Sequence, residues 1–117
     1  MNRIRIVLLA GLAALAVAAV SAQAATPVLN GTDGPGFTIT LTQGGKKVTS
    51  LKAGTYTFKI ADKSNIHNFH LMGPGVNKMT TVAMVGSVSW TVTLKKGTYK
   101  YQCDPHATFM KGSFTVK

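Results

Sequence analysis

The sequence predicts an all-β fold, specifically a Greek-key antiparallel β-sandwich. Several short segments alternate apolar residues with Thr, Ser, Lys or Gln, which is the period of a half-buried strand. Stretches rich in Gly, Asn, Pro and Lys separate these segments at the spacing of a small sandwich. No segment has a convincing amphipathic helical pattern, so we expect the core to be built from strands.

Residues 1–24 are predicted to be a secretory signal peptide. A basic region at 2–5 precedes the uninterrupted apolar run Ile6 to Val20, and Ala22-Gln23-Ala24 is a small-x-small cleavage site. The alternative is an uncleaved anchor, but this run is shorter than the roughly 20 apolar residues that span a bilayer. We therefore expect cleavage near Ala24 and an extracytoplasmic protein, either periplasmic or secreted.

The rest of the chain is long enough for one domain with one core. We expect 25–36 to be a short lead-in and 37–117 to be the folded domain. The predicted strands are Phe37–Leu41, Tyr56–Ile60, Val88–Leu94, Tyr99–Cys103 and Phe114–Val116, and the turn-rich stretches are 30–36, 43–47, 73–77 and 95–97. The segment 79–86 fits neither period, and Trp90, between Val88 and Val92, is predicted to lie in the core.

One internal echo supports the Greek-key topology. Leu51-Lys-Ala-Gly-Thr-Tyr-Thr-Phe58 resembles Leu94-Lys-Lys-Gly-Thr-Tyr-Lys-Tyr101, and each couples a glycine turn to the start of an aromatic strand. Nothing else repeats, so we interpret the pair as two equivalent corners of a sandwich. In the second strand Tyr99, Tyr101 and Cys103 share one face, which directs the thiol toward the mouth of the core.

The mature chain is strongly basic. Without Arg3 and Arg5 it has eleven lysines, no arginine and three aspartates, a net charge of +8. Lysines without clustered arginines and interleaved aromatic residues do not indicate nucleic-acid binding. Two interpretations stay open: a solvated surface, or steering toward an acidic protein partner or an anionic membrane surface, as in peripheral association.

The single cysteine begins the most informative motif. One Cys cannot form an intramolecular disulfide, so in an oxidising compartment we expect it to be buried or occupied by metal. The run Cys103-Asp-Pro-His106-Ala-Thr-Phe-Met110 provides thiolate, imidazole and thioether, and a second imidazole would complete the His2Cys set with weak axial Met that is typical of copper electron-transfer sites. Of the other histidines, His67 shares a strand face with Phe69 and Leu71 and points inward, whereas His70 points outward.

These residues resemble the cupredoxins, and the pattern is most similar to plastocyanins and amicyanins. The matching residues are His67-Asn68, Gly97-Thr-Tyr99, Cys103-x-Pro105-His106 and Met110-Lys-Gly112, spread over nearly all of the mature chain. The resemblance implies that His67, Cys103, His106 and Met110 bind one type 1 copper ion. It also implies that Asn68 ties the His67 segment to the Cys103 loop and donates its N–H to the sulfur. Pro105 has no N–H to donate to the sulfur, so we expect a moderate reduction potential.

Two features depart from that pattern. The gap between His106 and Met110 is intermediate between the loops of the two subfamilies, and Gln102 replaces the tyrosine that plastocyanins use as a second electron exit. We therefore expect electrons to pass through the exposed edge of His106, ringed by Ala107, Phe109, Met72 and Pro74.

The predicted function is a small blue-copper electron carrier that is not an enzyme. Three histidines are too few for a second copper centre, and Cys103 with His106 lacks an orienting third group for hydrolysis. We expect a monomer with a redox protein partner that has an acidic docking face. The alternative is a copper chaperone or store, for which Met72, Met79, Met84 and His70 are the only support.

Overall fold

The structure is a computed structural model that describes residues 10–20 and 24–117. The basic region 2–5 and cleavage-site residues 22–23 of the predicted signal peptide lie outside the described residues. Residues 10–20 have no regular secondary structure and are exposed. Among the described residues, no helix has both the length and the apolar character needed to cross a membrane.

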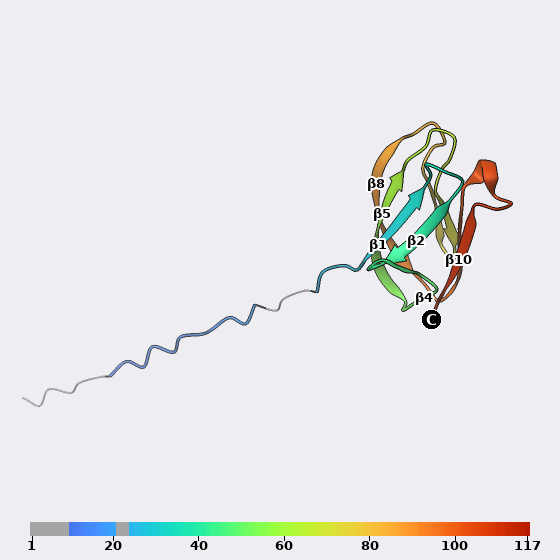
Figure 1. Cartoon of the computed structure of the whole chain (residues 1–117). Helices are drawn as coiled ribbons and strands as arrows, with labels where there is room; N and C mark the ends of the chain where they lie inside the picture. Colours follow the sequence, from blue (N-terminus) through green and yellow to red (C-terminus); the bar gives the residue numbers. More distant parts are fainter. Residues whose placement is uncertain (1–9, 21–23) are drawn as a thin grey trace, which may run out of the picture.

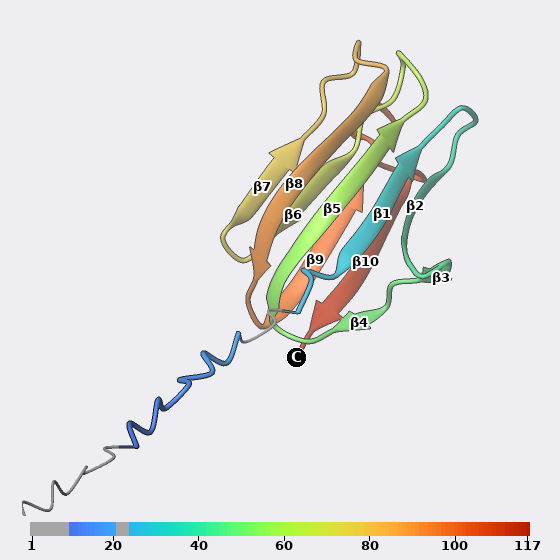
Figure 2. The ribbon, with the colours of Figure 1, turned by 90° about the vertical axis from the view of Figure 1, so that its left-hand side faces the viewer.

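The described chain forms two five-stranded sheets that face each other (Figure 1). One sheet has the order β3-β2-β1-β5-β8 and the other β4-β10-β9-β6-β7, as the turned view shows (Figure 2). The elements are β1 (Val28–Asp33), β2 (Ile39–Gln43), β3 (Lys46–Lys47), β4 (Ser50–Leu51), β5 (Gly54–Asp62), β6 (His70–Gly73), β7 (Val76–Met79), β8 (Gly86–Leu94), β9 (Gly97–Gln102), the 3-10 turn η1 (Asp104–His106) and β10 (Lys111–Val116). The all-β sandwich is therefore confirmed.

The sheets are mixed rather than purely antiparallel. β1 runs parallel to β5, and β10 runs parallel to β4, whereas the other strand pairs are antiparallel. The alternation of side chains does not distinguish the two pairings, because both place successive residues on opposite faces. The antiparallel prediction is thus wrong for one strand pair in each sheet.

The segment 30–36, predicted to be a turn, contributes most of β1. Leu29, Gly31 and Asp33 are its inward residues. Only one of the three has an apolar side chain, so the period-two signal is lost in the sequence. Gly31 is required by close packing, since a Cβ there would lie 2.6 Å from Ile60 Cδ1 and 2.9 Å from the Phe69 ring.

Three other segments also differ from the predictions. The strand predicted from Phe37 begins instead at Ile39, and Phe37 itself is 57% exposed. Residues Val76–Met79 form β7, although 73–77 was predicted to be a turn and 79–86 had no assignment. Trp90 is only partly buried and packs on the edge of the core rather than inside it.

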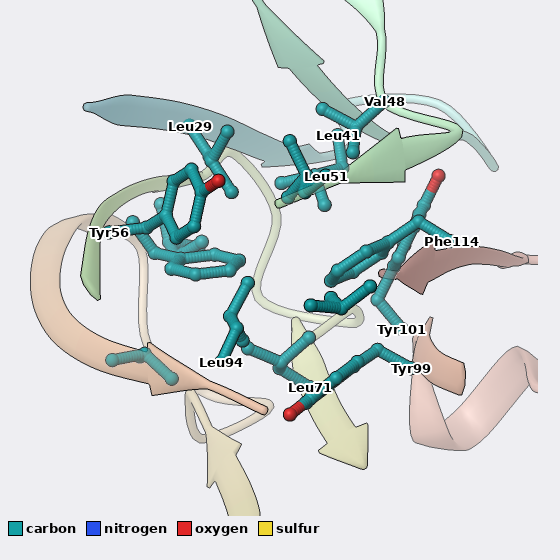
Figure 3. Packing of buried hydrophobic residues seen from close by; sticks show 14 of the residues in the cluster. Leu29, Leu41, Val48, Leu51, Tyr56, Leu71, Leu94, Tyr99, Tyr101 and Phe114 are labelled. Atoms are coloured by element: carbon teal, nitrogen blue, oxygen red, sulfur yellow. The ribbon is translucent and has the colours of Figure 1, made fainter. Parts of the chain in front are cut away.

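The core between the sheets is rich in aromatic side chains (Figure 3). Tyr99 stacks on Phe114 with ring centroids 5.3 Å apart, and Phe69 stacks on Tyr101 at 5.6 Å. Such pairs contribute about 0.5–1.5 kcal/mol beyond the burial of their area. Gly112 faces Tyr101, where a Cβ would lie 2.3 Å from the ring. This packing fixes β9 and β10 relative to each other, and Cys103 directly follows the last residue of β9.

The two echoing segments do form equivalent corners. The Tyr56 hydroxyl donates to the carbonyl oxygen of Lys52, 2.7 Å away and four residues earlier. The Tyr99 hydroxyl lies in the same relation to Lys95, accepting from its N–H at 2.9 Å and lying 3.1 Å from its carbonyl oxygen. Both corners lie at the end of the sandwich opposite Cys103, because Gly54 pairs with Leu94 and Gly97 with Val116.

Candidate metal centre

The loop from Cys103 to Met110 is held by its own backbone hydrogen bonds. The N–H of Cys103 donates to the Met110 carbonyl at 3.0 Å, which closes the loop at its base. The N–H of His106 donates to the Cys103 carbonyl at 3.0 Å, and the N–H of Met110 donates to the His106 carbonyl at 2.9 Å. Pro105 lies within η1 and needs no donor in this first turn. The three side chains thus belong to one compact turn at the end of β9.

His67 approaches this loop from the other side of the sandwich mouth. It lies between β5 and β6, is fully buried, and donates its N–H to the Ser64 carbonyl at 3.4 Å. Gly34, at φ +69°, allows the β1–β2 loop to pack against the ring, since a Cβ there would lie 3.3 Å from His67 Cδ2. The predicted inward orientation of His67 is therefore correct, although the residue precedes the strand.

The donor atoms of His67, Cys103 and His106 converge on one point. The two Nδ1 atoms are 3.1 Å apart, and Cys103 Sγ lies 3.7 Å from Nδ1 of His67 and 3.5 Å from Nδ1 of His106. The centre of that triangle is about 2 Å from each atom, a distance suited to nitrogen and thiolate ligands of a first-row metal. Met110 is 1% exposed and follows directly in the closed loop. This donor set and spacing fit copper. The other ring nitrogen of His67, Nε2, is buried and has no hydrogen-bond partner among the described residues.

Asn68 joins the His67 segment to the Cys103 loop through hydrogen bonds to Asp104. Its side-chain amide donates to Asp104 Oδ2 at 2.8 Å, and its Oδ1 accepts from the Asp104 N–H at 2.7 Å. The amide also reaches the Thr80 carbonyl at 3.2 Å. Asn68 is buried, because these partners enclose it. Its expected N–H donation to the cysteine sulfur stays a prediction.

Asp104 is at the centre of a polar network around the loop. This network was not predicted from the sequence. Its Oδ1 accepts from Gln102 Nε2 at 2.9 Å and lies 2.8 Å from His70 Nδ1. Burial alone would raise the pKa of Asp104, but hydrogen bonds from Gln102, Asn68 and His70 hold it below its ordinary value. Burial alone would lower the pKa of His70, yet its bonds to Asn77 and Asp104 and the charge of Asp104 raise it. His70 is therefore a half-buried network residue and lies outside the cluster of three donors.

A second buried network, centred on Asp62 and Thr80, holds the residues on both sides of His67. Asp62 Oδ2 accepts from Thr80 Oγ1 at 3.1 Å, and that hydroxyl oxygen accepts from the Phe69 N–H at 2.9 Å. Asp62 Oδ1 also accepts from the Ser64 N–H at 3.3 Å. The neighbouring Asp33 is fully buried with no hydrogen-bond partner for either oxygen. Burial, then the neighbouring carboxylate of Asp62, raise the pKa of Asp33 to about 7, so it is largely neutral in slightly acidic solution.

Phe37 covers the site and was missed because it was assigned to a strand. Its ring lies edge-on to both imidazoles, with centroids 5.1 Å from His67 and 5.0 Å from His106. Phe109 lies 6.0 Å from Phe37 and 5.7 Å from His106, and both phenylalanines are more than half exposed. The signal available in the sequence was its place directly after the Gly-Pro-Gly turn 34–36.

Two residues expected around His106 lie elsewhere. Pro74 is at the opposite end of the sandwich, where its carbonyl oxygen accepts from the Tyr99 hydroxyl at 3.2 Å. Met72 pairs with Lys100, two residues along β6 from His70. The prediction failed because β6 runs away from the site immediately after His70.

Fold and site together define a small β-sandwich protein with a soft-metal centre at one end. The chain belongs to the family of copper binding proteins of the plastocyanin/azurin type, whose family model matches residues 37–117. The expected resemblance to cupredoxins is therefore confirmed, and the family's cofactor is copper. A comparison with curated protein sequences found no match.

Solved structures show the same fold at low sequence identity. The copper protein rusticyanin is similar with a TM-score of 0.60 and 21% identity, over 81% of this chain and 80% of that chain. Reduced auracyanin from the photosynthetic bacterium Roseiflexus castenholzii has a TM-score of 0.55 and 22% identity, over 80% of this chain and 99% of that one. A multi-copper oxidase from Pediococcus acidilactici has a TM-score of 0.54 and 16% identity, with 85% of this chain matching 28% of the oxidase.

Proposed function

We propose that the protein is an exported blue-copper electron carrier, with one copper ion bound by His67, Cys103 and His106 and weakly by Met110. The observation that supports this most directly is the convergence of two Nδ1 atoms and one Sγ within 3.7 Å of one another. Copper held in this way supplies a single-electron couple between Cu(I) and Cu(II). No catalytic step is needed, and none is proposed.

The chain's contribution is a rigid ligand arrangement that suits both oxidation states. The His67 ring packs against Gly34, and the His67 N–H donates to the Ser64 carbonyl. The Cys103 loop is closed by its own backbone hydrogen bonds. Asn68 locks these two parts together through Asp104. Because the ligands are positioned before the metal binds, little rearrangement accompanies a change of charge, and electron transfer is fast.

Electrons enter and leave through His106. Its ring is partly exposed and lies against Phe37 and Phe109, which form an apolar rim. A redox protein partner would contact this rim. Lys63 directly follows Asp62 and Lys111 directly follows Met110; both are exposed and favour a partner with an acidic docking face. Reduced forms of the structurally similar rusticyanin and auracyanin are known, which agrees with a redox role here.

The alternative, a protein that delivers or stores copper, remains a separate hypothesis. Met79 is half exposed and pairs across the sheet with His70. However, both ring nitrogens of His70 already have close oxygen partners, Asp104 Oδ1 and Asn77 Oδ1. The surface methionines therefore lack the free imidazole that would make a second soft-metal site.

A copper titration tests the proposed site. We expect Cu(II) to bind with one equivalent and to produce an intense blue thiolate-to-copper absorption band. The band should be absent in Cys103→Ser, whereas Ser113→Ala, on the outer face of β10, should leave it unchanged. A colourless Cu(II) complex of the wild-type protein would show that the proposed ligand set is wrong.

A further inference from the structure

The end of the domain opposite the metal centre has a surface of lysines without aspartates. Four exposed lysines lie in the turns at the end opposite the metal centre, and we call this surface the basic end: Lys52, Lys95, Lys96 and Lys117. The strand register places them together, because Leu51 pairs with Val116, Val116 with Gly97, and Gly54 with Leu94.

The acidic residues lie at the other end. Asp33 and Asp62 pair at the far ends of β1 and β5, and Asp104 belongs to η1 beside the metal centre. These three are the only acidic residues of the sequence. The basic end therefore has no carboxylate side chain to neutralise it, and the domain carries a charge asymmetry from one end to the other.

The exposed apolar side chains also avoid the basic end. Within 24–117 the large exposed ones are Phe37, Ile66, Met79, Val85 and Phe109. They lie in loops at the metal end or, for Met79, opposite His70, which pairs with Gln102 just before Cys103. Protein–protein interfaces usually need apolar or aromatic anchors, and the basic end has none. It is suited instead to a surface recognised by charge alone.

The N-terminal chain enters at this same end. The Thr57 N–H, near the start of β5, donates to the Pro27 carbonyl at 2.9 Å, and Val28 pairs with Thr57. Both ribbon views show the preceding chain leaving beside β4 and the residue-117 end (Figures 1 and 2). The predicted signal peptide therefore precedes the domain at the basic end.

We propose that the basic end binds the anionic headgroups of a phospholipid membrane. Lysine ammonium groups are compact point charges that interact with diffuse negative charge, without the bidentate geometry that arginine gives to protein partners. Bound in this way, the domain directs His106, Phe37 and Phe109 away from the membrane. One end is then free to exchange electrons while the other holds the protein at the surface.

Vesicle co-sedimentation tests this proposal with the copper-loaded protein purified after export. We expect binding to mixed phosphatidylglycerol–phosphatidylcholine vesicles, no binding to pure phosphatidylcholine, and weaker binding as salt is raised. Replacing the four basic-end lysines with glutamine should weaken binding by about fivefold per lysine. Retention on pure phosphatidylcholine vesicles, or equal binding by the substituted protein, would overturn the proposal.

A matched variant controls for net charge. Lys59, Lys63, Lys78 and Lys100 lie outside the basic end, and their replacement with glutamine removes the same charge. We expect this variant to bind the anionic vesicles far more tightly than the basic-end variant; equal losses would mean that net charge, and not this surface, is responsible. The blue band reports that both variants are folded and loaded, so a failure of the copper site is distinguishable from a failure to bind membrane.

A protein partner is the competing explanation for the basic end. Reduction of an acidic redox protein by vesicle-free protein should be no slower in the basic-end variant than in the matched variant, because the two have the same net charge and the proposed electron exit is at the other end. A slower rate in the basic-end variant, with vesicle binding unchanged, would assign this surface to a protein and contradict the proposal.

Discussion

His67 and His70 are three residues apart in the sequence and have different surroundings. His67 is fully buried with Nδ1 facing Cys103 and His106, whereas His70 has both ring nitrogens in contact with Asp104 and Asn77. We expect His67→Ala to abolish the blue band and His70→Ala to retain it, as measured by absorption after addition of Cu(II). The reverse pattern would show that His70, and not His67, is the copper ligand.

Phe37 shields both imidazoles from water with an exposed ring. Its removal would let water approach the metal, and a more polar environment favours the more highly charged Cu(II) state. We therefore expect Phe37→Ala to lower the reduction potential, measured by voltammetry, while the blue band persists. Ile66→Ala is the control, since Ile66 is similarly exposed but has no ring contact with the imidazoles. Equal potentials in wild type and Phe37→Ala would show that the ring does not shield the metal.

Among the structural elements, the 63–69 segment and the Cys103 loop depend on each other. Asn68 makes two part-buried hydrogen bonds to Asp104 and one buried hydrogen bond to the Thr80 carbonyl. Loss of its side chain leaves these partners unsatisfied, which costs about 1–3 kcal/mol for each one that water cannot reach.

We expect Asn68→Ala to lower the free energy of unfolding by about 2–4 kcal/mol and to weaken copper binding. Denaturant unfolding of the copper-free protein measures the first effect, and competition with a chelator measures the second. Asn77→Ala, which removes only the contact to His70 Nε2, should have a much smaller effect on both. Comparable losses in the two variants would contradict a special role for Asn68.

Whether a strand could be predicted depends on whether its inward-facing residues are apolar. Strands with apolar residues at alternate positions, such as β5, β9 and β10, were predicted from the sequence, and so was the inward direction of Cys103. β1 was not predicted, because Gly31 and Asp33 occupy its inward positions, and Gly31 is explained only by its tertiary contacts with Ile60 and Phe69. The position of Phe37 was also missed, since a loop conformation is set by packing against His67 and His106 rather than by periodicity.

At the scale of the whole molecule, Asp33 links stability to pH. Its folded-state pKa of about 7 is above the ordinary value of 3.8, so the folded state binds more protons than the unfolded state between about pH 4 and 7. The contribution of Asp33 to stability is present at low pH and is lost as the pH rises through this window. The slope is on the order of 1 kcal/mol per pH unit.

Asp33→Asn removes this titration while keeping the shape of the side chain. We expect the free energy of unfolding of the variant, relative to wild type, to increase from pH 4 to pH 7 and then to level off. Urea unfolding at a series of pH values measures this difference, and the comparison cancels contributions from His70 and Asp104. A difference that does not change with pH would mean that Asp33 is ionised in the folded protein.

The molecule as a whole separates its proposed tasks along one axis. The apolar rim, the three aspartates and the metal ligands lie at one end, and the basic end with the incoming N-terminal chain lies at the other. The sandwich between them has a core of buried side chains contributed by both sheets (Figure 3). Electron exchange at one end is therefore compatible with attachment at the other.

The most direct test of an electron carrier is a redox cycle of the copper-loaded protein in the presence of a Cu(I) chelator. We expect reduction to bleach the blue band, reoxidation to restore it fully, and the copper to stay bound throughout, because the buried and pre-positioned ligands suit both oxidation states. Transfer of copper to the chelator on reduction, with no return of the band, would contradict electron transfer as the function and favour copper delivery.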